Sequence, residues 1–384
     1  MNNKSRKNSV VELLCHPKWS SISVAVLSIL LSMVVASVLL LLLGKNPLEA
    51  YAALLKGCGV LPKSSYGGGG GMLADFCTFL NLLAPMIIAS LAFVIASKAG
   101  LFNIGIAGQM LCGAYLSYLL VGYSDMNAWL AKPLTILVSL AVGGILGAFV
   151  GFLKYRFNIH EVVSTILINH IIRYLVGFSI NGWHANSMTR NSQPVSTAAR
   201  LSWTGVSIFN QTCSIPLGIF IAVIFAFAVQ YLLNRTVFGF EIKSIGMNNK
   251  CARYTGIRVG RGIVVAMAIS GMLAGLAGAC YYTGYLNNIV PNTLSSMGYD
   301  AIAVAVLGNI SPVGCILASF LITIFQQGTN YMSSTVGVAK EIANLITGIL
   351  LLFSACGGYF KYLARNYLDK AAEKAGKSGE QKEA

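Results

Sequence analysis

The sequence predicts an all-α polytopic membrane protein with about ten membrane segments. Of its 384 residues, 56% are hydrophobic and only 10% are charged, whereas a soluble domain carries about 25% charged residues. Stretches without any charge, such as the one from Lys18 to Lys45, can hold bilayer-spanning helices, which need roughly 20 residues each. These stretches do not alternate between apolar and polar residues, so they disfavour a transmembrane β-barrel.

The apolar runs define the expected segments in chain order. The first, Ile22 to Leu43, is too long for the core of a signal peptide and lacks a small-residue cleavage site, so we expect a retained helix. The eighth is too short to cross a membrane at about 1.5 Å per residue, so we expect a half-helix there. The expected segments are 22–43, 77–97, 103–122, 132–153, 159–181, 214–233, 262–284, 298–309, 312–332 and 338–356.

The basic residues indicate the orientation of these segments. The net charge is +15, but the lysines and arginines gather at the ends of the expected spans, which is a topology signal and not the pattern of a nucleic-acid binder. A cytoplasmic N-terminus places most of them inside. We therefore expect a multi-pass protein of the cell (cytoplasmic or inner) membrane, with a cytoplasmic segment 1–21, a transmembrane domain 22–356 and a basic cytoplasmic tail 357–384.

Two expected spans carry ladders of small residues. Gly143, Gly147 and Gly151 recur every four residues in the fourth span, and Gly271 and Gly275 do so in the seventh. Such ladders let the backbones of two membrane helices approach closely. We expect these helices to pack tightly and assign no chemistry to the glycines.

The third segment interrupts its apolar pattern with Asn103, Gln109 and several glycines. Polar groups at membrane depth are costly unless they face protein or a water-filled path, so we expect part of a solute pathway here. The motif from Asn103 to Gly108 has an echo in Asn309 to Gly314, at a matching point of the expected topology. Because transporters often contain repeats with broken helices at matching positions, the echo predicts a pseudo-repeat of two halves.

Further polar residues lie in the fifth and eighth segments. Glu161, Thr165 and Asn169 follow one another at four-residue steps and share one face of a helix. They indicate either a polar stripe along a solute path or hydrogen bonds between helices, and the sequence leaves both open. Asp300, at the start of the short eighth segment, is expected to cap that half-helix, to face the path, or to do both.

The sequence gives no support for catalysis, a metal site or an ATP site in this chain. Its nine cysteines contain no C-x-x-C pair, and no set of His and Cys stands at metal-ligand spacing. Cys58 and Cys213 could both lie outside and pair, although nothing requires it. The tail contains Gly376-Lys377-Ser378, but Ala371 replaces the first glycine of a phosphate-binding loop and no strand precedes it.

The longest expected cytoplasmic loop, 234–261, mixes basic residues with apolar ones at helical spacing. A helix on the membrane surface would explain this pattern. A helix that docks into a cytoplasmic partner would explain it too. Gly246 and Gly256 bracket a short stretch, which favours the docking helix.

Several of these motifs, taken together, resemble one family of membrane proteins. The resemblance is to the permease subunits of ABC importers for simple sugars, nucleosides and branched-chain amino acids, and most of all to the nucleoside type. It runs in order through roughly residues 75–335. The motifs are Gly100–Met110, Glu161–Asn169, the loop from Gly246 to Ile257, Ser270–Gly278, and Tyr299–Gly308 with Pro312.

The resemblance implies partners. These are a cytoplasmic ATP-binding subunit that holds ATP and Mg²⁺, a second homologous permease, and an extracellular or periplasmic substrate-binding protein, with the lipid bilayer around the chain. Loop 234–261 would hold the coupling helix for the ATPase. Its residues in this sequence are Gly246, Asn248, Ala252, Gly256 and Ile257. Ala107 departs from the family, which has an acidic residue there.

We therefore expect a transport subunit that performs no covalent chemistry, holds no cofactor and carries nucleosides or a related sugar-containing solute. Its expected pathway residues are Asn103, Gln109, Glu161, Thr165, Asn169, Asp300 and Asn309. Two alternatives remain at this point. One is an ion-coupled secondary transporter, and the other is an ABC permease for simple sugars or branched-chain amino acids.

Overall fold

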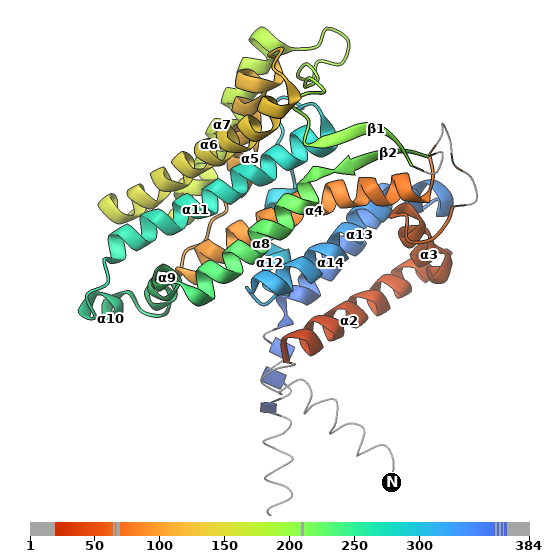
Figure 1. The fold of residues 1–384 in the computed structure, drawn as a ribbon. Coiled ribbons are helices and arrows are strands. Elements are labelled where there is room, and N and C mark those ends of the chain that lie inside the picture. Colours follow the sequence, from red (N-terminus) through yellow and green to blue (C-terminus); the bar gives the residue numbers. More distant parts are fainter. Residues whose placement is uncertain are drawn as a thin grey trace, which may run out of the picture.

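The computed structural model describes residues 20–63, 66, 70–208 and 211–357, and near the C-terminal end 359–360, 362–363 and 365–366. Within this part the chain is mostly helical, and its long helices run side by side in one bundle (Figure 1). The expected N-terminal segment 1–21 and basic tail 357–384 fall almost entirely outside the described residues.

The elements follow one another in this order: α2 (Ser20–Leu42), α3 (Pro47–Gly57), α4 (Met72–Lys98), α5 (Ile106–Ser117), the π-helical turn η1 (Tyr118–Gly122), α6 (Ala128–Phe157), α7 (Glu161–Ser179), η2 (Ile180–His184), β1 (Ser202–Ile208), β2 (Gln211–Pro216), α8 (Leu217–Arg235), α9 (Val237–Met247), α10 (Asn249–Tyr254), α11 (Val259–Ala279), η3 (Cys280–Leu286), α12 (Met297–Leu307), α13 (Pro312–Val336) and α14 (Lys340–Ala355).

The helices confirm a multi-pass membrane protein. Within the described residues, six helices are long and apolar enough to cross a membrane, and a seventh span exists if α2 and α3 count as one broken span. These two helices are bent by 116° relative to each other. Two shorter apolar helices, Ile106–Gly122 and Met297–Leu307, add to the bundle. Ten membrane segments and a pseudo-repeat of two halves stay predictions.

Strands β1 and β2 form an antiparallel hairpin that an all-α fold does not contain. The sixth segment, expected from residue 214, therefore starts as a helix only at Leu217. The hairpin packs on the first turns of α4. Gln211 Oε1 accepts a hydrogen bond from the Leu73 amide at 3.2 Å, and Asn81 Nδ2 donates to the Ser214 carbonyl oxygen at 3.2 Å.

Helices α6 and α11 form the closest helix pair, through the glycine ladders. A Cβ atom on Gly143 would lie 2.1 Å from the Gly271 carbonyl oxygen, and one on Gly275 would lie 2.1 Å from the Ser139 carbonyl oxygen. Only glycine permits such an approach of two backbones. The predicted tight packing of these two helices is confirmed.

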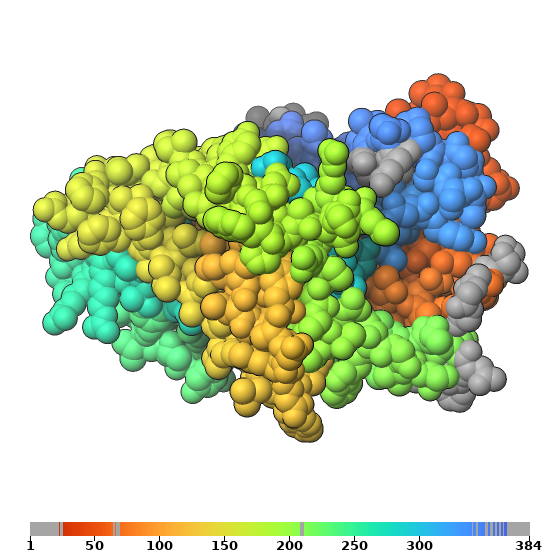
Figure 2. Space-filling model, turned by 90° about the horizontal axis from the view of Figure 1, so that it is seen from above, coloured from red at the N-terminus to blue at the C-terminus, as the bar shows by residue number. Residues whose placement is uncertain are grey.

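The two ends of the bundle differ. Short helices α9 and α10 form one end, and the hairpin lies toward the opposite end (Figure 1). Seen from above, the yellow-green segment around residues 180–208 lies between the yellow of α6 and the blue of α13 (Figure 2). Helix α4 runs through the centre, and 94% of its most apolar stretch is buried.

Candidate functional site

The break between α4 and α5 is held by a buried polar cluster around Asn103, whose side chain is fully buried. Asn103 Nδ2 donates to Gln109 Oε1 at 3.0 Å and to Ser270 Oγ at 2.9 Å. Its Oδ1 accepts from the Gly105 amide at 2.9 Å. Ser270, on α11, in turn donates to the Ala92 carbonyl oxygen at 2.7 Å. Asn103 and Ser270 together thus tie α4, α5 and α11 to one another.

Asn169 fastens α7 to the same break. Its Oδ1 accepts from the Gly108 amide at 2.9 Å, and its Nδ2 donates to the Ile104 carbonyl oxygen at 3.0 Å. Thr165, one turn earlier, is fully buried and donates to the Glu161 carbonyl oxygen at 2.8 Å. The bond from the Gly108 amide satisfies an N–H group in the first turn of α5, which a helix N-terminus leaves without an internal partner.

Four of the expected pathway residues, namely Asn103, Gln109, Thr165 and Asn169, therefore meet around the first turn of α5. All four are buried. Most of their hydrogen bonds are to backbone groups or to one another. One polar atom of these four side chains has no such bond: Gln109 Nε2 is buried without a hydrogen-bond partner among the described residues.

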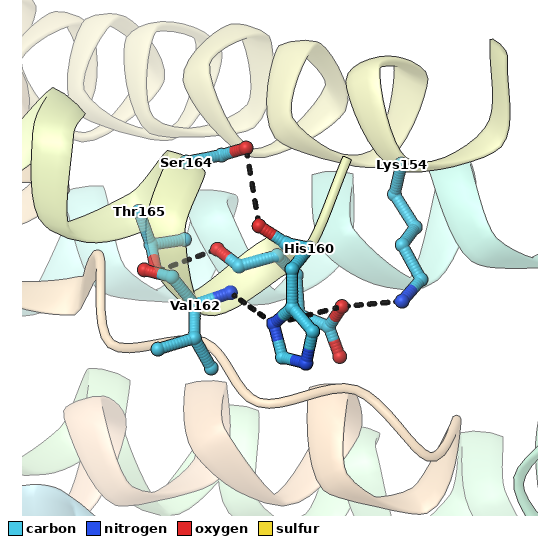
Figure 3. Close-up of polar contacts among 6 residues, drawn as sticks. Lys154, His160, Val162, Ser164 and Thr165 are labelled. Carbon is cyan, nitrogen blue, oxygen red and sulfur yellow. Dashed lines mark hydrogen bonds and ion pairs between the residues drawn. The ribbon is translucent and has the colours of Figure 1, made fainter. Parts of the chain in front are cut away.

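Glu161, the first residue of α7, forms an ion pair with Lys154 near the end of α6. Figure 3 shows Lys154 and the neighbouring His160. Lys154 Nζ is 2.5 Å from Glu161 Oε2, and the Glu161 side chain is only 8% exposed. The His160 ring lies beside the pair, with Nδ1 at 3.8 Å from the same oxygen. That Nδ1 also accepts from the Val162 amide at 3.3 Å, and so caps α7. The ion pair joins the end of α6 to the start of α7.

Asp300 lies apart from this cluster, at an open cavity of about 510 Å³. The cavity is formed by η3 and by α12, α13 and α14, which are neighbours in the bundle (Figure 1). Asp300 Oδ2 accepts from Gln326 Nε2, on α13, at 2.8 Å. The lining residues are Leu82, Tyr281, Tyr285, Ser296, Met297, Asp300, Gln326, Thr329, Asn330, Thr347 and Gly348.

One wall of this cavity is aromatic. The rings of Tyr281 and Tyr285 stack with centroids 5.9 Å apart and planes at 25°. The Tyr285 hydroxyl donates to Gln327 Oε1 at 3.4 Å. The volume lies in the range of about 300–1,000 Å³ that is usual for small-molecule sites, which also combine aromatic walls with a few placed polar groups.

Sequence reasoning singled out Asp300 alone among these lining residues. A usable signal was present, because Gln326, Gln327 and Asn330 interrupt the apolar pattern within the charge-free stretch between Asp300 and Lys340. This run of polar residues at membrane depth resembles the interruption at Asn103, and the same argument applies to both.

Asn309, the last of the expected pathway residues, is not near Asp300. It follows the far end of α12 at Leu307, which lies about 10 Å along the helix axis from Asp300 at about 1.5 Å per residue. Its side chain is exposed, and its φ of 54° places it in the left-handed turn that leads into α13.

The start of α12 packs directly onto the start of α5. A Cβ atom on Gly298 would lie 2.6 Å from Ala107 Cα. Ala107 is fully buried at this contact. The Tyr299 hydroxyl lies 3.5 Å from Asn169 Nδ2. The buried cluster and the cavity are therefore adjacent parts of one structure.

The expected coupling residues lie on the short helices α9 and α10. Asn248 separates the two helices and caps α10, because its Oδ1 accepts from the amides of Lys250 and Cys251 at 2.9 and 3.2 Å. Ala252 is 3% exposed and anchors α10 from beneath. Gly256 has a φ of +85° and leaves α10 by a turn that suits glycine.

The other two coupling residues connect these helices with the bundle. A Cβ atom on Gly246 would lie 2.2 Å from the Lys98 carbonyl oxygen, so the end of α9 touches the backbone at the end of α4. Ile257 is partly buried against the core, and its amide donates to the Ala252 carbonyl oxygen at 3.0 Å. On the opposite side, Met247 and Tyr254 are 87% and 92% exposed.

Among the described residues, no group of three or more His, Cys, Asp or Glu side chains is arranged to hold a metal ion. Cys58 and Cys213 do not form the disulfide that the sequence left open. The Cys58 thiol donates to the Ile324 carbonyl oxygen at 3.3 Å, and both cysteines are free thiols.

A multi-pass helical chain with buried polar clusters and an open polar cavity has the features of a membrane transport protein. The chain belongs to the family described as branched-chain amino acid transport system / permease component, which matches residues 76–355. It is thus the permease component of an ABC transporter. Chains of this kind carry no ATPase domain, and ATP is bound by a partner subunit.

Curated relatives match over most of their length. The chain is 28% identical to the nucleoside ABC transporter permease protein NupB of Lactococcus lactis subsp. cremoris, covering 99% of this chain and 100% of NupB. It is 29% identical to the guanosine ABC transporter permease protein NupP of Bacillus subtilis, covering 92% and 99%. It is 25% identical to the glucose ABC transporter permease protein TsgB13 of Haloferax volcanii, covering 90% of each chain. No solved structure matches.

Proposed function

We propose that this chain is the membrane subunit of an ABC importer that carries nucleosides across the cell membrane, with both termini in the cytoplasm. The observation that carries the choice of substrate is the end-to-end similarity to two permeases named for nucleosides and for guanosine. The glucose permease matches over a smaller share of the chain at 25% identity. A simple sugar is therefore the second candidate.

The partners follow from this assignment. A cytoplasmic ATP-binding subunit docks on the end formed by α9 and α10, where Met247 and Tyr254 project from short, capped helices. A substrate-binding protein delivers the solute at the opposite end, beside the β1–β2 hairpin (Figure 1). A second, homologous permease completes the transmembrane part. In this orientation the basic loop 234–261 is cytoplasmic, in keeping with the charge bias of such loops.

Backbone contacts connect the proposed docking end with the polar cavity. The end of α9 touches the end of α4 at Gly246 and Lys98. The chain then passes through the Asn103 turn into α5, and α5 touches α12 where Ala107 meets Gly298. Asp300 follows two residues later. Because packed interfaces of this kind resist gradual deformation, a shift of α9 moves these elements as a group.

Under this proposal, the expected pathway residues have different roles, and most of them hold the structure in shape. Asn103, Gln109, Thr165 and Asn169 keep the broken α4–α5 connection in shape, and Glu161 fastens the α6–α7 turn. Asp300 faces the cavity and is the one placed to meet a solute. Asn309 marks the turn between α12 and α13. The unpartnered Gln109 Nε2 is the one group of the buried cluster with bonding capacity to spare within the described residues.

The proposed drive is ATP hydrolysis by the partner and not an ion gradient. This choice rests on the family, whose permeases work with an ATP-binding partner. Of the two ionisable pathway residues, Glu161 is held by Lys154 at 2.5 Å. The test is uptake of labelled guanosine into proteoliposomes holding the complete complex. We expect uptake that requires ATP inside and the ATPase subunit. Uptake that proceeds without ATP and follows an imposed ion gradient would refute the proposal.

A further inference from the structure

The cavity around Asp300 holds more polar bonding capacity than the fold uses. A carboxylate has about four acceptor positions, and Gln326 and Ser296 contact that of Asp300. Asn330 lies at the same cavity with an exposed side chain. Polar and ionisable groups within membrane helices are expensive, and those that face a cavity mark substrate paths.

The buried cluster around Asn103 provides a contrast. Its members are fully buried and bonded mainly to backbone, so it has a structural explanation and no room for a solute. The Asp300 cavity is open and holds about 510 Å³. A site for a small solute must have both free bonding groups and space, and of these two polar sites only the cavity has both.

The two walls of the cavity differ in chemistry. Tyr281 and Tyr285 form a stacked aromatic wall contributed by η3. Asp300, Gln326 and Asn330 form a wall of carboxylate and amide groups contributed by α12 and α13. A nucleoside has the same division, because its base is a flat aromatic ring and its sugar carries hydroxyl groups. Aromatic side chains stack on bases of any sequence. Carboxylates accept hydrogen bonds from hydroxyls, and side-chain amides both accept and donate.

We propose that the cavity formed by η3, α12, α13 and α14 is the site where this permease holds its solute during passage. The base stacks on the ring of Tyr285, beside Tyr281. The sugar hydroxyls donate to Asp300 and bond to the amides of Gln326 and Asn330. This assignment rests on the proposed nucleoside transport and names the residues that recognise the nucleoside. A free sugar without a base meets only one of the two walls.

The first test is uptake of labelled guanosine by the complete complex with single substitutions in the cavity. Tyr285→Ala removes the stacking wall, and removal of one base stack costs about 5- to 100-fold. We expect a rise of that size in the KM for delivered guanosine, with Tyr285→Phe close to wild type. Asp300→Asn keeps the shape but loses the charge, and we expect a loss of about tenfold or more in kcat/KM.

The matched control is Tyr231→Ala, on α8, where the ring is 64% exposed and away from the cavity. It is expected to transport like the wild type. If wild-type complex takes up guanosine while Tyr285→Ala and Asp300→Asn, at equal membrane expression, match it, the cavity assignment is wrong and the proposed function stands. If wild-type complex takes up no guanosine, the proposed function itself fails.

A second test does not depend on turnover. Gly348→Cys places a thiol at the cavity without removing a proposed binding group, because Gly348 lines the cavity, is exposed, and a Cβ atom there meets no atom within 4 Å. Modification of this thiol by a small water-soluble reagent is followed by mass spectrometry of that peptide. In the complex with its binding protein, we expect guanosine to slow the modification at least severalfold and ribose to leave it unchanged. Equal rates with and without guanosine would overturn the assignment. Equal protection by ribose would overturn the role of the tyrosine wall.

Discussion

Gly246→Ala tests whether the contact between α9 and α4 transmits the action of the ATPase. The added methyl group would lie 2.2 Å from the Lys98 carbonyl oxygen, whereas ordinary contacts begin at 3.4 Å. The end of α9 must therefore withdraw by about 1 Å. Overpacking of this kind costs about 1–3 kcal/mol. At about 1.4 kcal/mol per factor of ten, the docked arrangement loses about 5- to 100-fold in population.

The assay compares guanosine uptake and ATP hydrolysis in the same reconstituted complex. We expect uptake to fall by at least fivefold while ATP hydrolysis stays within twofold of the wild type, because the ATPase subunit itself is unchanged. Gly182→Ala is the matched control, since a Cβ atom there meets no atom within 4 Å. Normal uptake by Gly246→Ala at equal expression would refute transmission through this contact.

Three further substitutions test the packing and polar contacts. Lys154→Met leaves the buried Glu161 carboxylate without its partner and should cost up to about 3–5 kcal/mol of stability, measured as a lower melting temperature in detergent. Adding Glu161→Gln should restore most of this loss, and a double variant that shows no rescue would argue against the pair. Asn103→Leu should cost about 1–3 kcal/mol by leaving its buried partners unbonded, and an unchanged melting temperature would show that the cluster is not structural. Gly271→Val should destabilise the chain by at least about 1–3 kcal/mol, because its side chain would meet the Gly143 backbone; a stable, fully active variant would contradict the close packing of α6 and α11.

The helices could be predicted from the sequence because long apolar runs have few alternative structures. Each of the ten expected ranges overlaps a helix or a helix with its π-helical end, although the sixth begins within strand β2. Helix α3 and the hairpin were missed, since both are short and lie in stretches without a membrane signal. For α3 the local cue was weak, namely Asn46 as a cap before Pro47. In the hairpin the strand pairing is irregular, with a register shift between Trp203 and Val206.

The polar sites could be predicted only in part. Sequence spacing correctly placed Thr165 and Asn169 on one helix face, but it could not show that Lys154 is the partner of Glu161. That pairing depends on a reversal of the chain at Asn158, which has a φ of 54°. The contact between Asp300 and Gln326 likewise depends on how α12 folds back against α13.

The coupling residues show the same limit. Sequence pattern suggested a short docking helix, and the structure places α9 and α10 there. The role of Gly246 as a contact with the Lys98 backbone depends on a tertiary approach between segments nearly 150 residues apart. No periodicity within the loop contains that information.

The most direct measurement of the central claim is a competition series in proteoliposomes that hold the complete complex and ATP. Labelled guanosine uptake is measured against an excess of unlabelled nucleosides, ribose, glucose or leucine. We predict that nucleosides abolish the uptake of label and that ribose, glucose and leucine leave it unchanged. No ATP-dependent guanosine uptake, or uptake that glucose or leucine suppresses as strongly as a nucleoside does, would contradict the account.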